Sequence, residues 1–127
     1  MHRKVKLHLS NTSGLNLFTA YGDGFVSVNH EKHEKNLIVL PENLLPAWST
    51  ANITTLAETD MQLLAGLDVE IILLGTGMRL RFPAPPLMRP FAATRIGLEV
   101  MDIQAACRTY NILASEGRKV AAALLFD

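Results

Sequence analysis

The sequence predicts an α/β layered domain, with residues 1–127 forming a single domain. Three observations lead to this fold class. The C-terminal half alternates segments with strand and helix patterns, which is typical of α/β proteins. Val69–Leu74 is nearly all apolar and rich in β-branched residues, as in strands that are covered on both faces. The N-terminal third carries short apolar runs between turns, which indicates an additional hairpin layer or edge strands.

We expect short strands in the N-terminal third, over residues 15–20, 25–28 and 37–40. The first two are separated by Tyr21–Gly24, whose glycines provide the positive φ that tight turns require. Residues 29–34 are polar and predict a turn. Pro41 follows the third strand and stops it.

The first helix is expected to begin at Thr55. Thr55 and Glu58 have the spacing of a capping box, in which the hydroxyl and the carboxylate satisfy free backbone N–H groups. Gly66 is a candidate left-handed stop for this helix. Its apolar face is predicted to contain Leu56, Leu63, Leu64 and Leu67.

The middle of the chain is expected to continue with a strand at Val69–Leu74 and the loop Gly75-Thr76-Gly77. Arg79–Phe82 has an extended pattern, and a proline-rich loop follows it. A short helix is predicted over Leu87–Thr94, where Pro90 is tolerated only in the first turn. Gly97–Met101 is the next predicted strand.

A second, longer helix is predicted after Asp102, whose carboxylate is suited to accept from the first free amides as an N-cap. Its apolar face recurs at helical spacing, and Gln104, Arg108, Asn111 and Ser115 form the opposite stripe. Gly117 ends the helix and residues 119–126 form the last strand. The predicted apolar face contains Ile103, Ala106, Cys107, Tyr110, Leu113 and Ala114.

The amino-acid composition limits which kinds of partner and which cellular compartment we expect. Twelve Lys+Arg balance twelve Asp+Glu, so the formal net charge is +0, and no nucleic-acid partner is expected. The single cysteine excludes an intramolecular disulfide, and no apolar run has the length of a signal peptide or a transmembrane segment. We therefore expect a cytoplasmic protein. A charged fraction of only 19% leaves apolar surface available, which favours a homodimer through a sheet edge or an apolar patch.

The motifs that suggest enzyme chemistry are incomplete. Gly75-x-Gly77 lacks the third glycine and the directly following helix of a dinucleotide site. His30 and His33 have metal-ligand spacing, but no second pair of ligands accompanies them, so a solvated hairpin tip is expected and no metal. Cys107 lies on the apolar helix face, where a thiol packs as a small hydrophobe. We expect no cofactor and no catalytic residue.

One polar set remains as a candidate pocket. The glycine loop follows a buried strand, and in open α/β sheets ligands bind beyond the carboxyl ends of strands. Polar residues of the last helix and its end would complete such a pocket. The alternative is a solvated helix face with modest ion pairs. The candidate pocket consists of Gly75, Thr76, Gly77, Arg108, Asn111 and Arg118.

A long, specific pattern in the C-terminal segment consists of Gly97–Asp102, Ala105–Leu113, Glu116–Arg118 and Val120–Leu124, with upstream landmarks at Tyr21-Gly22, Pro41, Trp48 and Leu74–Gly77. This pattern resembles the family of mitochondrial complex I assembly factor 3, which includes uncharacterised bacterial and archaeal single-domain proteins. Ile103 departs from the threonine that is usual in the family.

The resemblance implies a three-layer α/β fold with a central mixed sheet, helices packed on it and a small N-terminal β layer. It also implies a non-enzymatic binding or assembly protein whose partners are subunits of a membrane respiratory complex. No catalytic residues come with the resemblance. A small-molecule pocket at Gly75-Thr76-Gly77 beside the last helix, with or without catalysis, is the alternative function.

Overall fold

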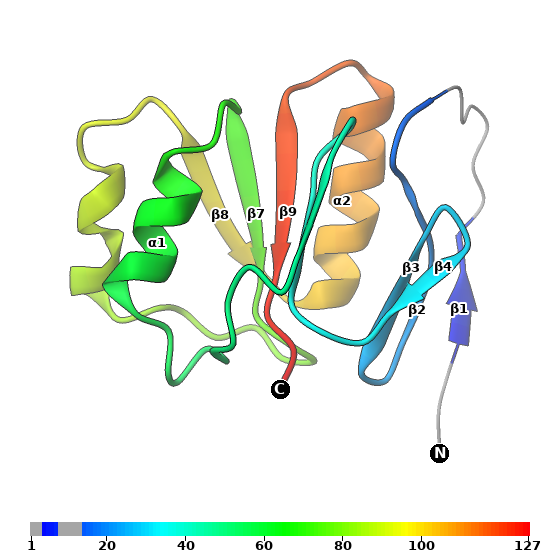
Figure 1. The fold of residues 1–127 in the computed structure, drawn as a ribbon, viewed down its shortest axis with the longest axis horizontal. Coiled ribbons are helices and arrows are strands. Elements are labelled where there is room, and N and C mark those ends of the chain that lie inside the picture. The colour runs from blue at the N-terminus through cyan, green and yellow to red at the C-terminus, as the bar shows by residue number, and fades with distance from the viewer. Residues whose placement is uncertain (1–3, 8–13) are drawn as a thin grey trace.

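The computed structural model describes residues 4–7 and 14–127, which form two sheets and three helical segments (Figure 1). The larger sheet is mixed, because β7 is parallel to β8 and β9 whereas β5 is antiparallel to β9 and β6. Its strands, in spatial order, are β6 (Leu44–Pro46), β5 (Leu37–Val39), β9 (Val120–Leu124), β7 (Ile71–Gly75) and β8 (Gly97–Met101). The smaller sheet is antiparallel and consists of β1 (Lys4–Lys6), β2 (Phe18–Gly22), β3 (Phe25–Val28) and β4 (Glu31–His33).

The helices cover the larger sheet on both faces. The helices α1 (Glu58–Ala65) and η1 (Pro85–Phe91, a 3₁₀ helix) lie on one face, and α2 (Ile103–Ser115) lies on the other. The smaller sheet packs against α2 through β2. These layers confirm the predicted α/β fold with a central mixed sheet and a small N-terminal β layer.

Two buried clusters lie on opposite faces of the larger sheet, because successive side chains of β7 point to opposite faces. Ile72 and Leu74 pack with Met61 and Leu64 of α1, whereas Leu73 belongs to the cluster beneath α2. The prediction of a strand covered on both faces is thus confirmed. The neighbouring β9 contributes the run Ala121–Ala123, which is fully buried, and its small side chains allow the layers on both faces to approach closely.

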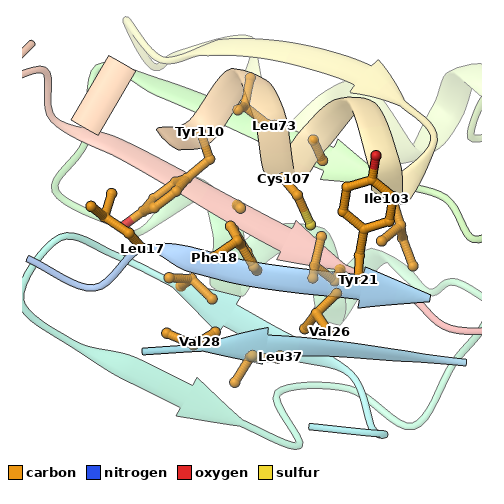
Figure 2. Packing of buried hydrophobic residues seen from close by; sticks show 14 of the residues in the cluster. Leu17, Phe18, Tyr21, Val26, Val28, Leu37, Leu73, Ile103, Cys107 and Tyr110 are labelled. Carbon is orange, nitrogen blue, oxygen red and sulfur yellow. The ribbon is translucent and has the colours of Figure 1, made fainter. Parts of the chain in front are cut away.

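The small sheet presents an aromatic surface to α2 through a bulge in β2. The register shifts between Phe18 and Ala20, so that Thr19 is an extra residue opposite β3. Phe18 and Tyr21 are three positions apart, yet both join the cluster under α2 (Figure 2). The ring of Phe18 meets Tyr110 edge to face, with centroids 5.3 Å apart, a favoured aromatic geometry.

The β8–α2 junction agrees with the sequence prediction in detail. The Asp102 carboxylate accepts a hydrogen bond from the Ala105 N–H at 2.8 Å, which confirms it as the N-cap. Cys107 and Tyr110 are buried on the predicted apolar face, and Gly117 follows the helix with a φ of +82°. The prediction for Asn111 is wrong, because this residue of the predicted polar stripe is buried.

The start and end of α1 differ from the prediction. The helix begins at Glu58, after Ala57, and the Asp60 carboxylate accepts from the Ala57 N–H at 2.9 Å. The Thr55 hydroxyl instead accepts from the Asn52 N–H in the preceding turn, at 3.0 Å. Gly66 has a φ of −89°, so it does not end the helix in the left-handed conformation.

Three short strands, β1, β4 and β6, were absent from the sequence prediction. Residues 29–34 were expected to be a turn, but only Asn29 and His30 turn, both with positive φ, and β4 follows directly. This is the two-residue connection that suits a twisted hairpin. The strand β6 ends in Pro46, which an edge strand tolerates because its N–H can remain unpaired.

Two further differences lie between β7 and β8. Arg79–Phe82 was predicted as extended, but it forms an exposed loop without a strand partner. Pro90 was expected only in a first helical turn, yet it lies inside η1. A 3₁₀ segment accepts it because so short a helix has few backbone hydrogen bonds to lose.

None of the helices in the described part of the chain has the length and apolar character that a membrane span requires.

Candidate functional site

The glycine loop at the end of β7 is packed against α2 and the C-terminal segment. A Cβ on Gly75 would lie 2.8 Å from Leu124 Cδ2 and 3.3 Å from Ile103 Cγ1. The Gly75 carbonyl accepts from the Leu125 N–H at 2.9 Å. Gly77 has a φ of +95°, and a Cβ there would collide with the Asp127 carboxylate. Both glycines are therefore required by close packing and backbone conformation.

Thr76 uses its hydroxyl within the loop. Its Oγ1 donates to the Arg79 carbonyl at 2.7 Å and accepts from the Arg81 N–H at 3.0 Å. Its backbone N–H donates to the Met101 carbonyl at 2.9 Å. The side chain is buried, so in this conformation Thr76 braces the following loop, and its hydroxyl is already engaged.

A hollow of about 290 Å³ lies beside Gly77, between the β2–β3 hairpin, the start of α2 and the C-terminal residues. Arg108 does not line it but reaches its edge, since Arg108 Nη1 donates to the Tyr21 hydroxyl at 3.2 Å. The remaining polar lining comes from three residues that carry a carboxylate or an amide. The hollow is lined by Tyr21, Gly22, Gly24, Glu34, Gly77, Met78, Ile103, Gln104, Phe126 and Asp127.

Asn111 connects α2 to the small sheet. Its Oδ1 accepts from the Phe18 N–H and its Nδ2 donates to the Phe18 carbonyl, each at 2.9 Å. The primary amide thus offers one donor and one acceptor to one residue of β2, as a neighbouring strand would. Asn111 is a structural contact between layers in this conformation.

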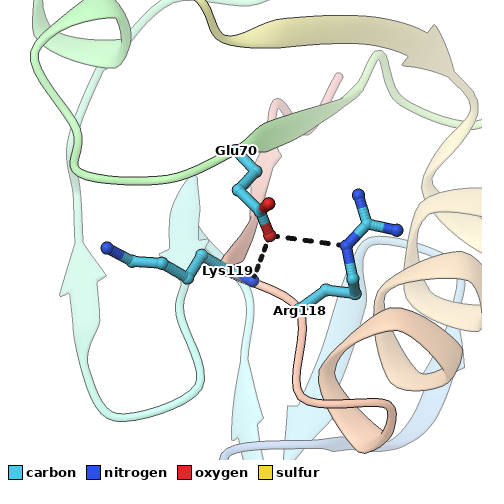
Figure 3. Close-up of polar contacts among 3 residues, drawn as sticks. All are labelled: Glu70, Arg118 and Lys119. Atoms are coloured by element: carbon cyan, nitrogen blue, oxygen red, sulfur yellow. Dashed lines mark hydrogen bonds and ion pairs between the residues drawn. The ribbon is translucent and has the colours of Figure 1, made fainter.

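Arg118 lies beyond the other end of α2. Its Nε is 3.4 Å from Glu70 Oε1, and the Lys119 N–H donates to the same oxygen at 3.2 Å (Figure 3). The Lys119 N–H, and then the Arg118 side chain, hold the pKa of Glu70 below its ordinary value. This group borders a cleft of about 600 Å³, whose lining includes Arg118, Lys119 and Asp68.

The predicted pocket residues are therefore distributed over separate places. The helix α2 has 13 residues, which at 1.5 Å per residue extends about 20 Å and separates Arg118 from the glycine loop. Of the six, Gly77 lines the hollow, Arg108 reaches its edge through Tyr21, and Arg118 lines the distant cleft. Gly75, Thr76 and Asn111 are buried in contacts between elements.

The other chemistry-bearing candidates have structural surroundings. Cys107 is fully buried, and burial raises its thiol pKa far above the ordinary value, so the thiol is protonated at neutral pH. His30 is in the β3–β4 turn and His33 is on β4. Among the residues that the structure describes, no three potential metal ligands of the His, Cys, Asp or Glu type cluster together.

The sequence analysis did not predict that large apolar side chains are exposed in the loop after β7. Met78, Leu80 and Phe82 are 45, 51 and 72% exposed, and Arg79 and Arg81 between them are exposed too. The alternation of apolar and basic residues was visible in the sequence and was interpreted as an extended segment. Only the structure shows that its apolar side chains lack a covering layer.

The sequence model of a protein family matches residues 18–125, which include both sheets except β1. The family is described as "Protein of unknown function (DUF498/DUF598)". The chain belongs to this family.

Curated relatives agree with the resemblance seen in the sequence. The chain is 33% identical over 104 residues to "NADH dehydrogenase [ubiquinone] 1 alpha subcomplex assembly factor 3" of Bos taurus, a match that covers 80% of this chain and 55% of that protein. The mouse protein of the same name is 30% identical over 90 residues, covering 69% of this chain and 48% of its own length. The chain thus spans about half the length of these relatives.

Solved structures share the fold. A crystal structure of a Bordetella parapertussis protein is 41% identical, with a TM-score of 0.82, and the match covers 92% of this chain and all of that one. A solution structure of a Bordetella pertussis protein, described as an Mth938-like domain, is 35% identical with a TM-score of 0.76 and covers 95 and 92% of the two chains. The two-sheet arrangement is therefore an Mth938-like fold.

Proposed function

We propose that the protein is a non-enzymatic assembly factor that binds a subunit of a membrane respiratory complex from the aqueous side. The observation that carries this proposal is the similarity to complex I assembly factor 3, which extends over 80% of the chain at 33% identity. One fold supports many functions, so the proposal relies on sequence similarity over most of the chain rather than on the fold alone.

The geometry is consistent with binding as the main activity. Gly75, Thr76 and Asn111 are engaged in packing and hydrogen bonds between elements. Cys107 is protonated and buried in the cluster under α2 (Figure 2). Three of the six candidate pocket residues and the thiol thus stabilise the scaffold, which leaves exposed surface as the main place for a partner.

Deletion of the gene tests the assembly role in a cell that contains a respiratory NADH dehydrogenase. We expect less assembled NADH dehydrogenase on native gels and a lower NADH-oxidising activity of the membranes. Succinate dehydrogenase activity serves as the internal control and is expected to stay unchanged. Tagged protein should also crosslink to a subunit of the unfinished complex. Normal assembly in the deletion strain, or crosslinks to soluble enzymes alone, would refute the proposal.

The second candidate function is small-molecule binding in the hollow beside Gly77. The specific observation that favours it is the Arg108–Tyr21 hydrogen bond at the edge of a hollow of about 290 Å³. Gln104→Trp is expected to fill the hollow and abolish any ligand-induced rise in melting temperature, whereas Ile112→Ser on the exposed side of α2 leaves it unchanged. A metabolite screen without any such rise would eliminate this function.

We further propose that two copies associate along an open sheet edge and that the protein works in the cytoplasm. β8 and β6 are the outer strands of the larger sheet, and an unpaired strand edge is a template for a second chain. Light scattering at micromolar concentration should give twice 14.0 kDa. A 14.0 kDa species alone would reject the dimer, and cell fractionation tests the compartment.

A further inference from the structure

The loop between β7 and η1 displays large apolar side chains to solvent. It runs along the lower edge of Figure 1 as the light-green segment near the C-terminus. Met78, Leu80 and Phe82 are all exposed, and Phe82 is 72% exposed. We call residues 78–82 the docking loop. Neighbouring apolar side chains that remain exposed in a folded protein commonly mark an interaction surface.

The exposure of these side chains is combined with a fixed backbone. Thr76 Oγ1 donates to the Arg79 carbonyl and accepts from the Arg81 N–H. The Asp127 carboxylate accepts from the Met78 N–H at 3.3 Å. Pro83, which is buried, ends the loop. The chain is therefore braced at both ends, and its apolar side chains are held away from the core.

The charged side chains of the docking loop and of the segment that follows it are all arginines, and Asp127, which accepts from the Met78 N–H, is an acidic neighbour. Residues 71–98 contain Arg79, Arg81, Arg89 and Arg95 but neither a lysine nor an acidic residue. All four arginines are exposed. In the described part of the chain, the ion pairs are Glu70–Arg118 and Asp68–Lys119. The loop arginines thus have no carboxylate partner there, although the protein as a whole has a formal charge of +0.

We propose that the docking loop binds the protein to the surface of an anionic phospholipid bilayer. Guanidinium groups bind phosphate oxygens in a bidentate manner and are more weakly hydrated than ammonium groups. Met78, Leu80 and Phe82 would enter the boundary between headgroups and acyl chains. A bilayer offers a negative layer directly above an apolar one over its whole area, which matches the interleaved order of the docking loop. An acidic groove on a protein would have to match each side chain separately.

Sedimentation with vesicles tests this proposal on the full chain. We expect it to bind vesicles in which about a third of the lipid is phosphatidylglycerol, more tightly than pure phosphatidylcholine vesicles and less tightly at high salt. Arg79→Gln/Arg81→Gln should lower the partition coefficient by roughly 30-fold, since each basic residue near such a surface contributes about a fivefold factor. Leu80→Ser/Phe82→Ser should lower it by at least about tenfold.

Matched controls separate the docking loop from general charge and hydrophobicity. Lys32→Gln/Lys35→Gln removes two exposed positive charges, one on β4 and one in the segment that follows it, and Ile112→Ser removes an apolar side chain that is 59% exposed on α2. Both are expected to bind within about twofold of the wild type. All the substituted side chains are exposed, and the melting temperature of each variant verifies that it is folded.

A label at Phe82 reports insertion directly. In Phe82→Cys, an environment-sensitive thiol dye should react at the new site alone, since Cys107 is buried and protonated. Its emission should shift to the blue on phosphatidylglycerol vesicles. Equal binding to both lipids, equal losses in the loop and control variants, or an unshifted emission would overturn the proposal. If the docking loop instead bound an acidic segment of a partner protein, these negative results would be expected.

Bilayer docking is measured with pure lipid, so its outcome is independent of whether the protein assists a respiratory complex.

Discussion

Replacing Asn111 is expected to weaken the contact between the small sheet and α2. The Asn111 amide satisfies both the N–H and the carbonyl of Phe18, each at 2.9 Å in a buried setting. Asn111→Ala removes both partners and leaves two backbone groups beneath the helix. Because each of the two unsatisfied buried groups costs about 1–3 kcal/mol, we expect a loss of about 2–6 kcal/mol in the free energy of unfolding. That is a large part of the roughly 5–15 kcal/mol of a typical domain.

Urea unfolding followed by circular dichroism and by Trp48 fluorescence measures this loss. Trp48 reports on the larger sheet. Its Nε1 donates to the Leu124 carbonyl of β9, and its ring packs in the cluster on the face opposite α2. The neighbouring Ile112→Ala is the control, and its effect should stay within about 0.5 kcal/mol, as for most exposed sites. Hydrogen exchange at the Phe18 amide should also accelerate in Asn111→Ala. A loss below about 0.5 kcal/mol, with unchanged exchange at Phe18, would refute the role assigned to Asn111.

Three more predictions concern packing, the thiol and pH. Gly75→Ala should lower stability by about 1–3 kcal/mol in thermal unfolding, because its methyl group would press on the buried Leu124, and a neutral effect would contradict the close approach. Cys107 should react with a thiol reagent at pH 8 no faster than the protein unfolds, whereas rapid labelling would show that the thiol is accessible. The lowered pKa of Glu70, caused first by the Lys119 N–H, implies stabilisation that is present above the ordinary value of 4.5 and is lost as pH falls through the lowered pKa. The melting temperatures of Glu70→Gln and wild type should therefore converge in acid, and a constant difference would contradict this assignment.

Periodicity and capping were sufficient to predict the C-terminal part of the fold. Gly97–Met101 and the helix after Asp102 have strong patterns with a defined start, and the structure confirms both. The strand β4 was not predicted, because its residues Glu31–His33 are polar and have no apolar alternation. It forms because the two-residue turn at Asn29 and His30 returns the chain along β3.

The candidate site was harder to predict because the role of a polar residue depends on a distant partner. Asn111 occupies a polar stripe in the sequence, but the small sheet covers that side of α2 and supplies the Phe18 backbone. Arg108 lies within α2 and Arg118 lies beyond its C-terminal end, so the two arginines have different surroundings. Helical spacing gives the direction of a side chain and says nothing about which layer will cover it.

The contact between β2 and α2 has a consequence for synthesis on the ribosome. Phe18 and Asn111 are 93 positions apart, so the hairpin leaves the exit tunnel long before its helix exists. At usual elongation rates, roughly 5–20 s pass between the two. During that interval the apolar side of the hairpin, with Phe18, Val26 and Val28, lacks its cover. Nascent chains arrested before residue 103 should therefore recruit chaperones and be cut readily by proteases.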